Sequence, residues 1–253
     1  MDNHAVEIRN LLKKYKVANT EQCVLKDLNL TISEHEFVSL LGYTGCGKST
    51  LLRVICGLES YEDGEVFVFG NKITKPTKDN VLIYQDLNQL FPWKTAIKNI
   101  VYVLLKTNKG MKRKEAIERA EQFLDDVGLK KFANYYPHQM SGGMRQRCAV
   151  ARALSMNPKM LLMDEPFSAL DELNRRKLQE LCRKVFENSN LTVLFVTHSV
   201  DESITLSDKV IVMGKDEGNI IGVLENTYQY NKTEGERMNM RNKIMKILNS
   251  QYT

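Results

Sequence analysis

The sequence predicts an α/β fold built on a mainly parallel β-sheet, with a block of helices inserted into it. Apolar segments of strand length alternate with segments of helical periodicity along most of the 253 residues, which is typical of a parallel sheet connected by helices. A glycine-rich turn separates a strand-like apolar run, Phe37–Leu41, from a helical segment. A helical pattern over about residues 90–155 interrupts the alternation and indicates the insertion.

Composition sets broad limits on this fold. Hydrophobic residues make up 43% and charged residues 26%, and a chain of this length buries a sizeable core without disulfides or metal ions. The net charge of +5 suits an anionic nucleotide or a membrane surface, although an ordinary solvated surface accounts for most of the charges. The five cysteines show no CxxC or CxH spacing, so we expect reduced thiols in a cytosolic protein, without a disulfide framework or zinc site.

The sequence offers no candidate for a leader or a membrane span. The amino-terminal segment MDNHAVEIRN has no apolar signal core. The longest apolar runs, such as Val101–Leu105, fall far short of the roughly 20 residues that a spanning helix needs. If the protein works at a membrane, we therefore expect a partner that crosses it.

The individual elements follow from apolar periodicity and from the residues that end each segment. Residues 5–40 predict short strands joined by turns, and the tail from 231 onward predicts a polar, basic helix that packs on the core or frays. Between them we expect helix 48–56, strands Val66–Phe69 and Val81–Tyr84, a helical stretch at 94–130, helix 143–154, strand Met160–Met163, helix 172–188, and strands Thr192–Val196 and Val210–Met213. We expect one domain over residues 1–230, followed by the helical tail 231–253.

The glycine-rich turn has the pattern of a phosphate-binding loop. Residues 42–49 read GYTGCGKS, a G-x-x-x-x-G-K-S motif between a strand and a helix. Glycines let successive backbone N–H groups point at one anion, and the start of the helix adds positive potential. We expect Lys48 to reach the β- and γ-phosphates of a nucleotide and the Ser49 hydroxyl to bind Mg²⁺. The candidate phosphate site comprises Gly42, Tyr43, Thr44, Gly45, Cys46, Gly47, Lys48, Ser49 and Thr50.

Polar side chains follow three other predicted strands. In an open α/β sheet, ligands bind beyond the carboxyl ends of the strands, so these side chains should share an edge with the phosphate loop. Asp164 suits a water-mediated contact with Mg²⁺, and Glu165 suits a general base that polarises a water molecule. Gln85 could hold Mg²⁺ or that water, and His198 could touch the γ-phosphate. Each residue alone has an ordinary structural explanation, but their combination with the loop favours catalysis.

A second glycine-rich helix start lies at residues 141–143. Ser141 is a good N-cap, and Gly142 and Gly143 leave backbone N–H groups open at the start of an apolar-periodic helix. This segment is either a second phosphate site or an ordinary capped helix.

These motifs resemble those of the ABC ATPase family over nearly the whole chain. Residues 140–147, MSGGMRQR, are similar to the signature sequence of that family, with Met140 where leucine is usual. The resemblance implies a Walker A motif at 42–49, a Walker B motif at 160–164 followed by Glu165, a Q-loop at Gln85, a D-loop ending at Asp171 and a switch histidine at His198. It also implies that Tyr15 stacks on adenine, although a surface tyrosine is the alternative.

The resemblance implies both an architecture and an assembly. The fold would be a P-loop NTPase (RecA-like) core with an antiparallel β subdomain and an inserted α-helical subdomain at about residues 90–155. The cofactors would be ATP and Mg²⁺. Two copies would form a head-to-tail homodimer, with each ATP held between the Walker A motif of one chain and the signature of the other. ATP binding would close this dimer, and hydrolysis would open it.

The segment Phe91-Pro92-Trp93 resembles that of ATPases in importers for nitrate, sulfonates and taurine. The resemblance implies a peripheral subunit on the cytoplasmic face of the cell membrane, bound to transmembrane permease subunits that work with a substrate-binding protein. Leu90, Phe91 and Trp93 are the candidate docking residues, and a core tryptophan beside a proline turn is the alternative. Uptake of riboflavin or of pyrimidine precursors also remains open, because this subunit does not touch the solute.

Three other functions compete with this interpretation. A soluble ABC-type ATPase acting on DNA or ribosomes typically carries a long coiled coil or two ATPase copies, and this sequence has neither; we expect no nucleic-acid partner. A P-loop kinase would lack the Ser-Gly-Gly signature. An exporter ATPase could share the same core, and the Phe-Pro-Trp segment favours import.

Overall fold

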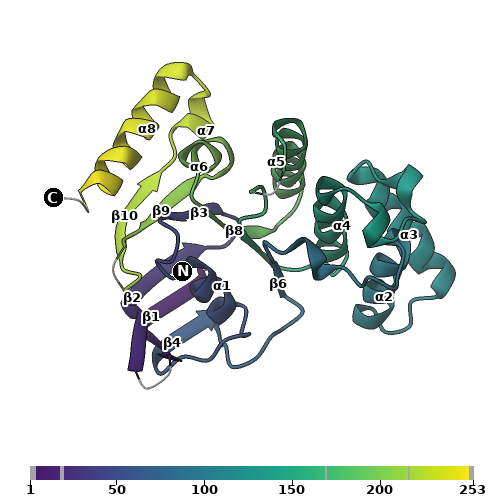
Figure 1. Ribbon diagram of the computed structural model, residues 1–253, viewed down its shortest axis with the longest axis horizontal. Coiled ribbons are helices and arrows are strands. Elements are labelled where there is room, and N and C mark those ends of the chain that lie inside the picture. Colours follow the sequence, from purple (N-terminus) through teal and green to yellow (C-terminus); the bar gives the residue numbers. More distant parts are fainter. Residues whose placement is uncertain (1–3, 18–19, 169, 216, 251–253) are drawn as a thin grey trace.

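Two β-sheets and a group of helices make up the protein. The computed structural model describes residues 4–17, 20–168, 170–215 and 217–250. One sheet has the strand order β2-β1-β4-β5, and the other has the order β10-β9-β3-β8-β7-β6. Figure 1 shows the helices α2, α3 and α4 extending to one side of the sheets, and α6, α7 and α8 gathered at the opposite end.

The smaller sheet is antiparallel, as the family resemblance implied. It contains β1 (His4–Val17), β2 (Thr20–Ser33), β4 (Asp63–Val68) and β5 (Asn71–Lys72). The expectation of short strands was wrong, because β1 and β2 each run for 14 residues. Register shifts interrupt their pairing, and Asn10 and Asp27 adopt positive φ angles there. Such bulges break the alternation that marks a long strand in the sequence.

The larger sheet is mainly parallel, as predicted. Its strands are β3 (Phe37–Gly42), β6 (Asn80–Ile83), β7 (Met160–Asp164), β8 (Thr192–Thr197), β9 (Lys209–Met213) and β10 (Ile220–Glu225). Every residue of β3 and β8 is buried, as expected for central strands covered on both faces. The antiparallel edge strand β10 was not predicted. Its residues are half-buried or exposed, and Gly222 interrupts its short apolar run of Ile220, Ile221, Val223 and Leu224.

The helices are α1 (Lys48–Ile55), α2 (Ala96–Thr107), α3 (Arg113–Asp126), α4 (Gly142–Leu154), α5 (Glu172–Glu187), α6 (Val200–Leu206), α7 (Tyr228–Asn231) and α8 (Glu234–Asn249). The described residues also form three short 3₁₀ turns, η1 (Leu87–Gln89), η2 (Lys130–Phe132) and η3 (Pro137–Gln139). The helical stretch predicted at 94–130 is two helices. Asn108 caps α2 and Gly110 takes a φ of 94°, which separates the two.

Separate cores hold the two parts of the molecule. The largest core lies between the sheets and includes Leu51, Leu52 and Ile55 of α1. The inserted helices have a core of their own, to which Ile100, Leu104, Ala116, Ala120, Leu124, Cys148 and Ala149 contribute. The helix that follows the phosphate loop is therefore fixed within the main body, whereas α4 contributes both to the core of the inserted helices and, through Val150 and Ala153, to a core of the larger sheet.

The carboxyl-terminal helix packs on the main body. Met240, Ile244 and Leu248 of α8 are buried with Leu41 of β3 and with residues of α6 and β9. One face of this otherwise polar helix is thus part of the core.

None of the helices in the described residues is both long and apolar enough to span a membrane. The five cysteines are free thiols.

Candidate nucleotide-binding and catalytic site

The phosphate loop joins the end of β3 to the start of α1. Gly45 has a φ of 85°, and a β-carbon there would meet nothing within 4 Å, so the loop is open above it. Gly47 has a φ of 101° and lies under Leu25, whose Cδ2 would be 2.8 Å from an added β-carbon. At Gly42 the same β-carbon would lie 2.8 Å from the carbonyl oxygen of Met213, so this glycine allows close packing against β9.

Lys48 lies across the loop. Its side chain is buried, and Nζ donates hydrogen bonds to the carbonyl oxygens of Gly42 and Tyr43 at 2.8 and 2.6 Å. Within the described part of the chain, no ion pair includes Lys48. The third partner of Nζ is the Cys46 Sγ at 3.8 Å. A buried ammonium that is held by carbonyl oxygens and a thiol, without a carboxylate, fits an anion placed in the loop.

Ser49 and Asp164 meet beneath the loop. The Ser49 hydroxyl donates a hydrogen bond of 2.9 Å to Oδ1 of Asp164 at the end of β7. Burial raises the pKa of the Asp164 carboxyl, and the hydrogen bond from Ser49 opposes that rise. A hydroxyl and a carboxylate suit Mg²⁺, which takes few protein ligands and keeps several waters. The described residues contain no cluster of three or more His, Cys, Asp or Glu side chains that would replace those waters.

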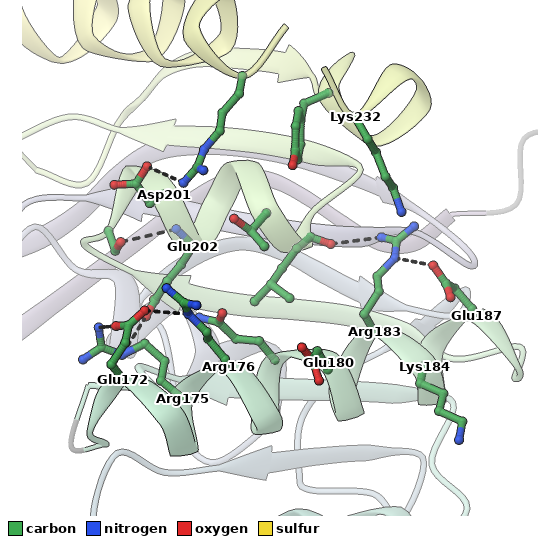
Figure 2. A pocket seen from close by; sticks show the side chains of 16 residues that line it. Glu172, Arg175, Arg176, Glu180, Arg183, Lys184, Glu187, Asp201, Glu202 and Lys232 are labelled. Atoms are coloured by element: carbon green, nitrogen blue, oxygen red, sulfur yellow. Dashed lines mark hydrogen bonds and ion pairs between the residues drawn. The ribbon is translucent and has the colours of Figure 1, made fainter. Parts of the chain in front are cut away.

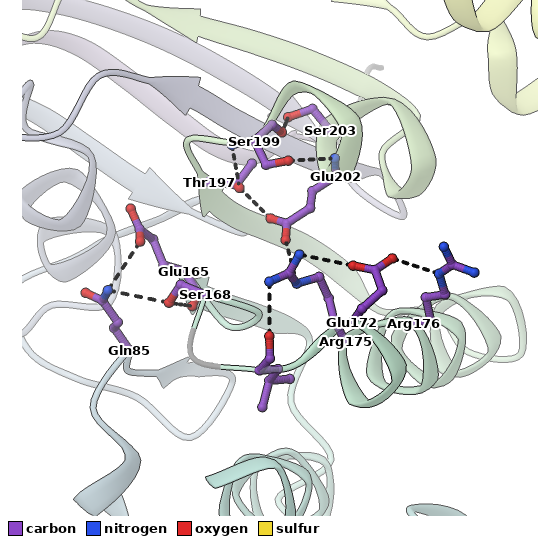
Figure 3. A network of polar contacts seen from close by, with 11 residues as sticks. Gln85, Glu165, Ser168, Glu172, Arg175, Arg176, Thr197, Ser199, Glu202 and Ser203 are labelled. Carbon is purple, nitrogen blue, oxygen red and sulfur yellow. Dashed lines mark hydrogen bonds and ion pairs between the residues drawn. The ribbon is translucent and has the colours of Figure 1, made fainter.

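Glu165 lies between two other predicted residues. Its Oε2 accepts a hydrogen bond of 3.2 Å from Nε2 of Gln85, and its Oε1 lies 3.2 Å from Nδ1 of His198 (Figure 3 shows the Gln85 contact). These residues follow the neighbouring strands β6, β7 and β8. Glu165 has a φ of 43°, a left-handed conformation that costs a side chain about 1–3 kcal/mol and often occurs at functional sites. Its N–H donates to the carbonyl of Val196, which holds this turn.

A cavity of about 510 Å³ lies in front of these groups. It is lined by Tyr15, Val24, Thr44, Gly45, Gly47, Lys48, Ser49, Thr50, Gln85, Glu165 and His198. The structure therefore brings Gln85, Glu165 and His198 together with most of the loop, whereas Asp164 contacts the loop through Ser49 and does not line the cavity. Tyr43 instead packs partly into the core, and the side chain of Cys46 is buried, which raises the pKa of its thiol.

Tyr15 forms one side of the cavity, and the sequence did not reveal what supports it. The Tyr15 hydroxyl lies 3.4 Å from Oγ1 of Thr50. The buried ammonium of Lys13 lies 4.8 Å from the centre of the Tyr15 ring and forms ion pairs with Glu59 and Glu62. An alternating strand pattern would have shown which face Tyr15 shares, but bulges in β1 break that pattern.

The second glycine-rich helix start lies elsewhere in the molecule. The exposed Ser141 caps α4, because its Oγ accepts a hydrogen bond of 3.3 Å from the Met144 N–H. Asp171 caps α5 in the same way, through the Asn174 N–H, and these contacts lower the pKa of its carboxyl. Neither Ser141, Gly142, Gly143 nor Asp171 lines the cavity at the phosphate loop. The structure does not bring these residues to that site within one chain.

The Phe91–Trp93 segment lies on the surface of the helical part. Trp93 is 70% exposed, so the alternative of a core tryptophan was wrong. The Phe91 ring lies between Trp93 and Tyr102, with ring centres 5.7 and 5.2 Å away. The expectation that Leu90 forms part of this surface was also wrong, because Leu90 is buried in the helical core. Leu90 follows a 3₁₀ turn that aims it inward.

The phosphate loop, the Ser49–Asp164 pair and the glutamate that follows β7 together define a nucleotide-binding cassette of the P-loop class. The family model described as ABC transporter matches residues 25–168, which is more than half of the chain. The chain belongs to the ABC transporter family.

Several curated proteins of this family are similar along nearly the whole chain. An uncharacterized ABC transporter ATP-binding protein of Methanocaldococcus jannaschii is 39% identical over 245 residues, covering 96% of this chain and 91% of the relative. The aliphatic sulfonates import ATP-binding protein SsuB of Bacillus thuringiensis subsp. konkukian is 40% identical over 240 residues, 93% of each chain. The bicarbonate transport ATP-binding protein CmpC of Synechococcus elongatus is 41% identical over 86% of this chain, which is 33% of that longer protein.

A solved ATP-binding cassette has the same fold. Its dimeric structure in a post-hydrolysis state, bound to ADP and phosphate, superposes with a TM-score of 0.79 at 34% identity. The match covers 87% of this chain and 98% of the cassette.

Proposed function

We propose that this protein binds and hydrolyses ATP to drive the import of a small anion such as nitrate, a sulfonate or taurine. The observation that carries this proposal is the position of Glu165, held by Gln85 and His198 at the edge of the cavity that the phosphate loop forms. Relatives named for the import of aliphatic sulfonates, bicarbonate and nitrate support the class of solute.

The residues of the cavity divide into binding and catalytic groups. The N–H groups of residues 42–50 and the Lys48 ammonium hold the phosphates of ATP, and Tyr15 stacks on adenine. Ser49 and Gln85 hold Mg²⁺, with Asp164 behind Ser49; the ion would neutralise charge that develops on the phosphoryl oxygens. Glu165 accepts a proton from the attacking water. His198 holds Glu165 in place and contacts the γ-phosphate.

The active unit in this proposal is a homodimer. The open helix start at Ser141, Gly142 and Gly143 would contact the γ-phosphate bound to the partner subunit, and Asp171 would lie at the same interface. Two observations support this arrangement. The signature residues do not line the cavity of their own chain, and the similar cassette is dimeric with ADP and phosphate bound.

The remaining partners follow from the exposed aromatic surface. Trp93 and Phe91 would dock a transmembrane permease subunit, which places the ATPase at the cytoplasmic face of the membrane. An importer of this kind would receive its solute from a substrate-binding protein. Soluble or exporting relatives are the alternative, and the names of the similar importers favour uptake.

The variant Glu165→Gln tests the proposal. Removing the base should stop hydrolysis while the phosphate loop still binds ATP, so the protein should accumulate as a closed dimer. Light scattering with and without ATP and Mg²⁺ measures this change. A shift from monomer to dimer that requires ATP is the expected result, and the double variant Lys48→Ala, Glu165→Gln should remain a monomer. Near-normal turnover by Glu165→Gln would overturn the role of Glu165.

A further inference from the structure

The turn that carries His198 is tied to the first turn of α6. The Ser199 N–H donates to Oγ1 of Thr197 at 3.0 Å, and the Thr197 hydroxyl donates to Oε2 of Glu202 at 2.5 Å. The Glu202 N–H in turn donates to Oγ of Ser199. His198 lies between Thr197 and Ser199 in the chain, so the hydrogen bonds between these two residues and Glu202 (Figure 3) tie its position to the first turn of α6.

The helix α6 cannot fix its own position. It spans only Val200–Leu206, and a helix of two turns is marginal without tertiary contacts. Ile204 and Leu206 bury its inner face. Its first turn carries two carboxylates, Asp201 and Glu202, at the wall of a polar groove of about 830 Å³ whose other side is formed by α5 (Figure 2). Glu202 faces Arg175 of α5 at 4.0 Å.

The other carboxylate, Asp201, is held by α8. Nη1 of Arg241 donates to both oxygens of Asp201, at 3.0 and 2.9 Å, and Nη2 of Arg237 donates to Oδ1 at 3.2 Å. Arg241 also lines a cavity of about 440 Å³ together with Glu165 and His198. The carboxyl-terminal helix thus reaches the edge of the candidate catalytic site.

Apolar packing also holds α8 against α6 and β3. Its buried residues Met240, Ile244 and Leu248 contact a cluster that contains Ile204 of α6 and Leu41 of β3. The strand β3 leads directly into the phosphate loop. A movement of α8 would therefore move α6 relative to β3, and with it His198 relative to the loop.

We propose that α8 is a positioning element for His198, in which Arg241 and Arg237 hold Asp201 and so fix the turn between β8 and α6. This inference rests on the proposed ATPase function and adds to it a role for the carboxyl-terminal helix. The two arginines touch neither nucleotide nor water in this role; they act through α6. A displaced α8, for example under a partner subunit, would then lower ATP turnover without changing the phosphate loop.

The expected effects on turnover and on stability differ in size, which distinguishes a positioning role from a stabilising one. Exposed ion pairs contribute little to stability, and Asp201, Arg237 and Arg241 are all partly exposed. Removing them should therefore leave the melting temperature nearly unchanged. Misplacing a catalytic group by a fraction of an ångström lowers turnover far more, so we expect the double variant Arg237→Ala, Arg241→Ala to lose about fivefold to tenfold in kcat.

The experiment compares kcat, KM and the Kd of ATP in the full-length chain. The matched control is Lys243→Ala, Lys246→Ala, which removes two exposed cations from the same helix and should keep the parent kcat. The arginine double variant should lose kcat, while its Kd and KM stay within about twofold of the parent. A double variant with Arg241→Lys in place of Arg241→Ala should recover part of this loss, because lysine still donates to a carboxylate. Amide exchange over residues 198–204 should become faster in the arginine variant only.

The variant Asp201→Asn provides a second test of the inference. If the arginines act through Asp201, combining Asp201→Asn with the arginine variant should add no further loss. Additive losses, a loss equal to that of the lysine control, or a parallel loss of ATP binding would each overturn the inference. Failure of the proposed function gives a different result, because the parent chain would then not hydrolyse ATP or Glu165→Gln would remain active.

Discussion

Two helix starts of this protein, at α1 and at α4, look alike in the sequence and differ in the structure. Both have glycines and open N–H groups at the amino-terminal end of a helix. The start of α1 faces a cavity that is lined by Tyr15 of β1 and by the polar residues that follow β6, β7 and β8. The start of α4 carries the exposed Ser141 and contributes nothing to that cavity. One region is a nearly complete site, and the other lacks its counterpart within the chain.

The two helix starts also differ in the hydrophobic cores that hold them in place. The helix α1 is fixed in the main core between the two sheets, whereas α4 divides its buried residues between the core of the inserted helices and a core formed with β7, β8 and α5. A phosphate loop can then keep its geometry while the helical part moves as a unit. Such a division suits an ATPase whose second half-site comes from a partner subunit.

The largest expected effect comes from the complete site. Glu165→Gln should lower the turnover of ATP by about 10²- to 10⁴-fold, because the amide cannot accept a proton from water. Phosphate release measures the rate, and equilibrium nucleotide binding should remain within about twofold of the parent. Glu172→Gln, an exposed carboxylate on α5 outside the cavity, is the control and should keep the parent rate. A comparable loss in Glu172→Gln would show that the effect is not specific to the site.

The open helix start should give the next largest effect. Ser141→Arg places a long side chain over N–H groups that would serve the partner's nucleotide, and hydrolysis should fall by about 100-fold or more. ATP binding by the monomer should stay intact, since Ser141 lies outside its own cavity. Ser141→Ala removes only the helix cap and should be much milder, at about 1 kcal/mol of stability. Loss of monomer binding in Ser141→Arg would contradict the shared site.

Lys48→Ala should act on binding. The Lys48 ammonium is buried against neutral carbonyl oxygens, so its charge is available to phosphate. Its loss should raise the Kd of ATP by about 10- to 100-fold. Calorimetric titration of the monomer measures this directly. An unchanged Kd would remove the main distinction between the two helix starts.

The smallest expected effect on the isolated chain is that of Trp93→Ala. The side chain is 70% exposed and lies away from both helix starts, so ATP turnover should change by less than about twofold. In a reconstituted transporter the same variant should weaken the stimulation of turnover by solute. Leu90→Ala is a useful contrast, because Leu90 is buried and its truncation should lower the melting temperature of the helical part. Equal stimulation in Trp93→Ala and the parent transporter would exclude the docking role.

Local sequence determined much of the site. A glycine-rich loop followed by Lys48, a serine at the start of α4 and acidic residues at the end of β7 are features of neighbouring residues, because backbone conformation and capping depend on short-range geometry. The mainly parallel sheet also followed from the alternation of apolar runs and helical segments. The break between α2 and α3 was missed, although Asn108 and Gly110 interrupt the apolar pattern between the two helices.

Other features depend on which elements meet. The sequence shows neither the ion pairs of Lys13 beneath Tyr15 nor the burial of Leu90, and it shows no relation between Arg241 and Asp201, which lie 40 residues apart. The sequence by itself therefore determined the phosphate loop and the identity of the polar groups that follow the strands, which are local properties of the chain. The tertiary structure alone decided which atoms of Gln85 and His198 contact Glu165, that Leu90 is buried, and that α8 reaches α6. These outcomes depend on the register of strands and on packing between distant segments, which no local pattern encodes.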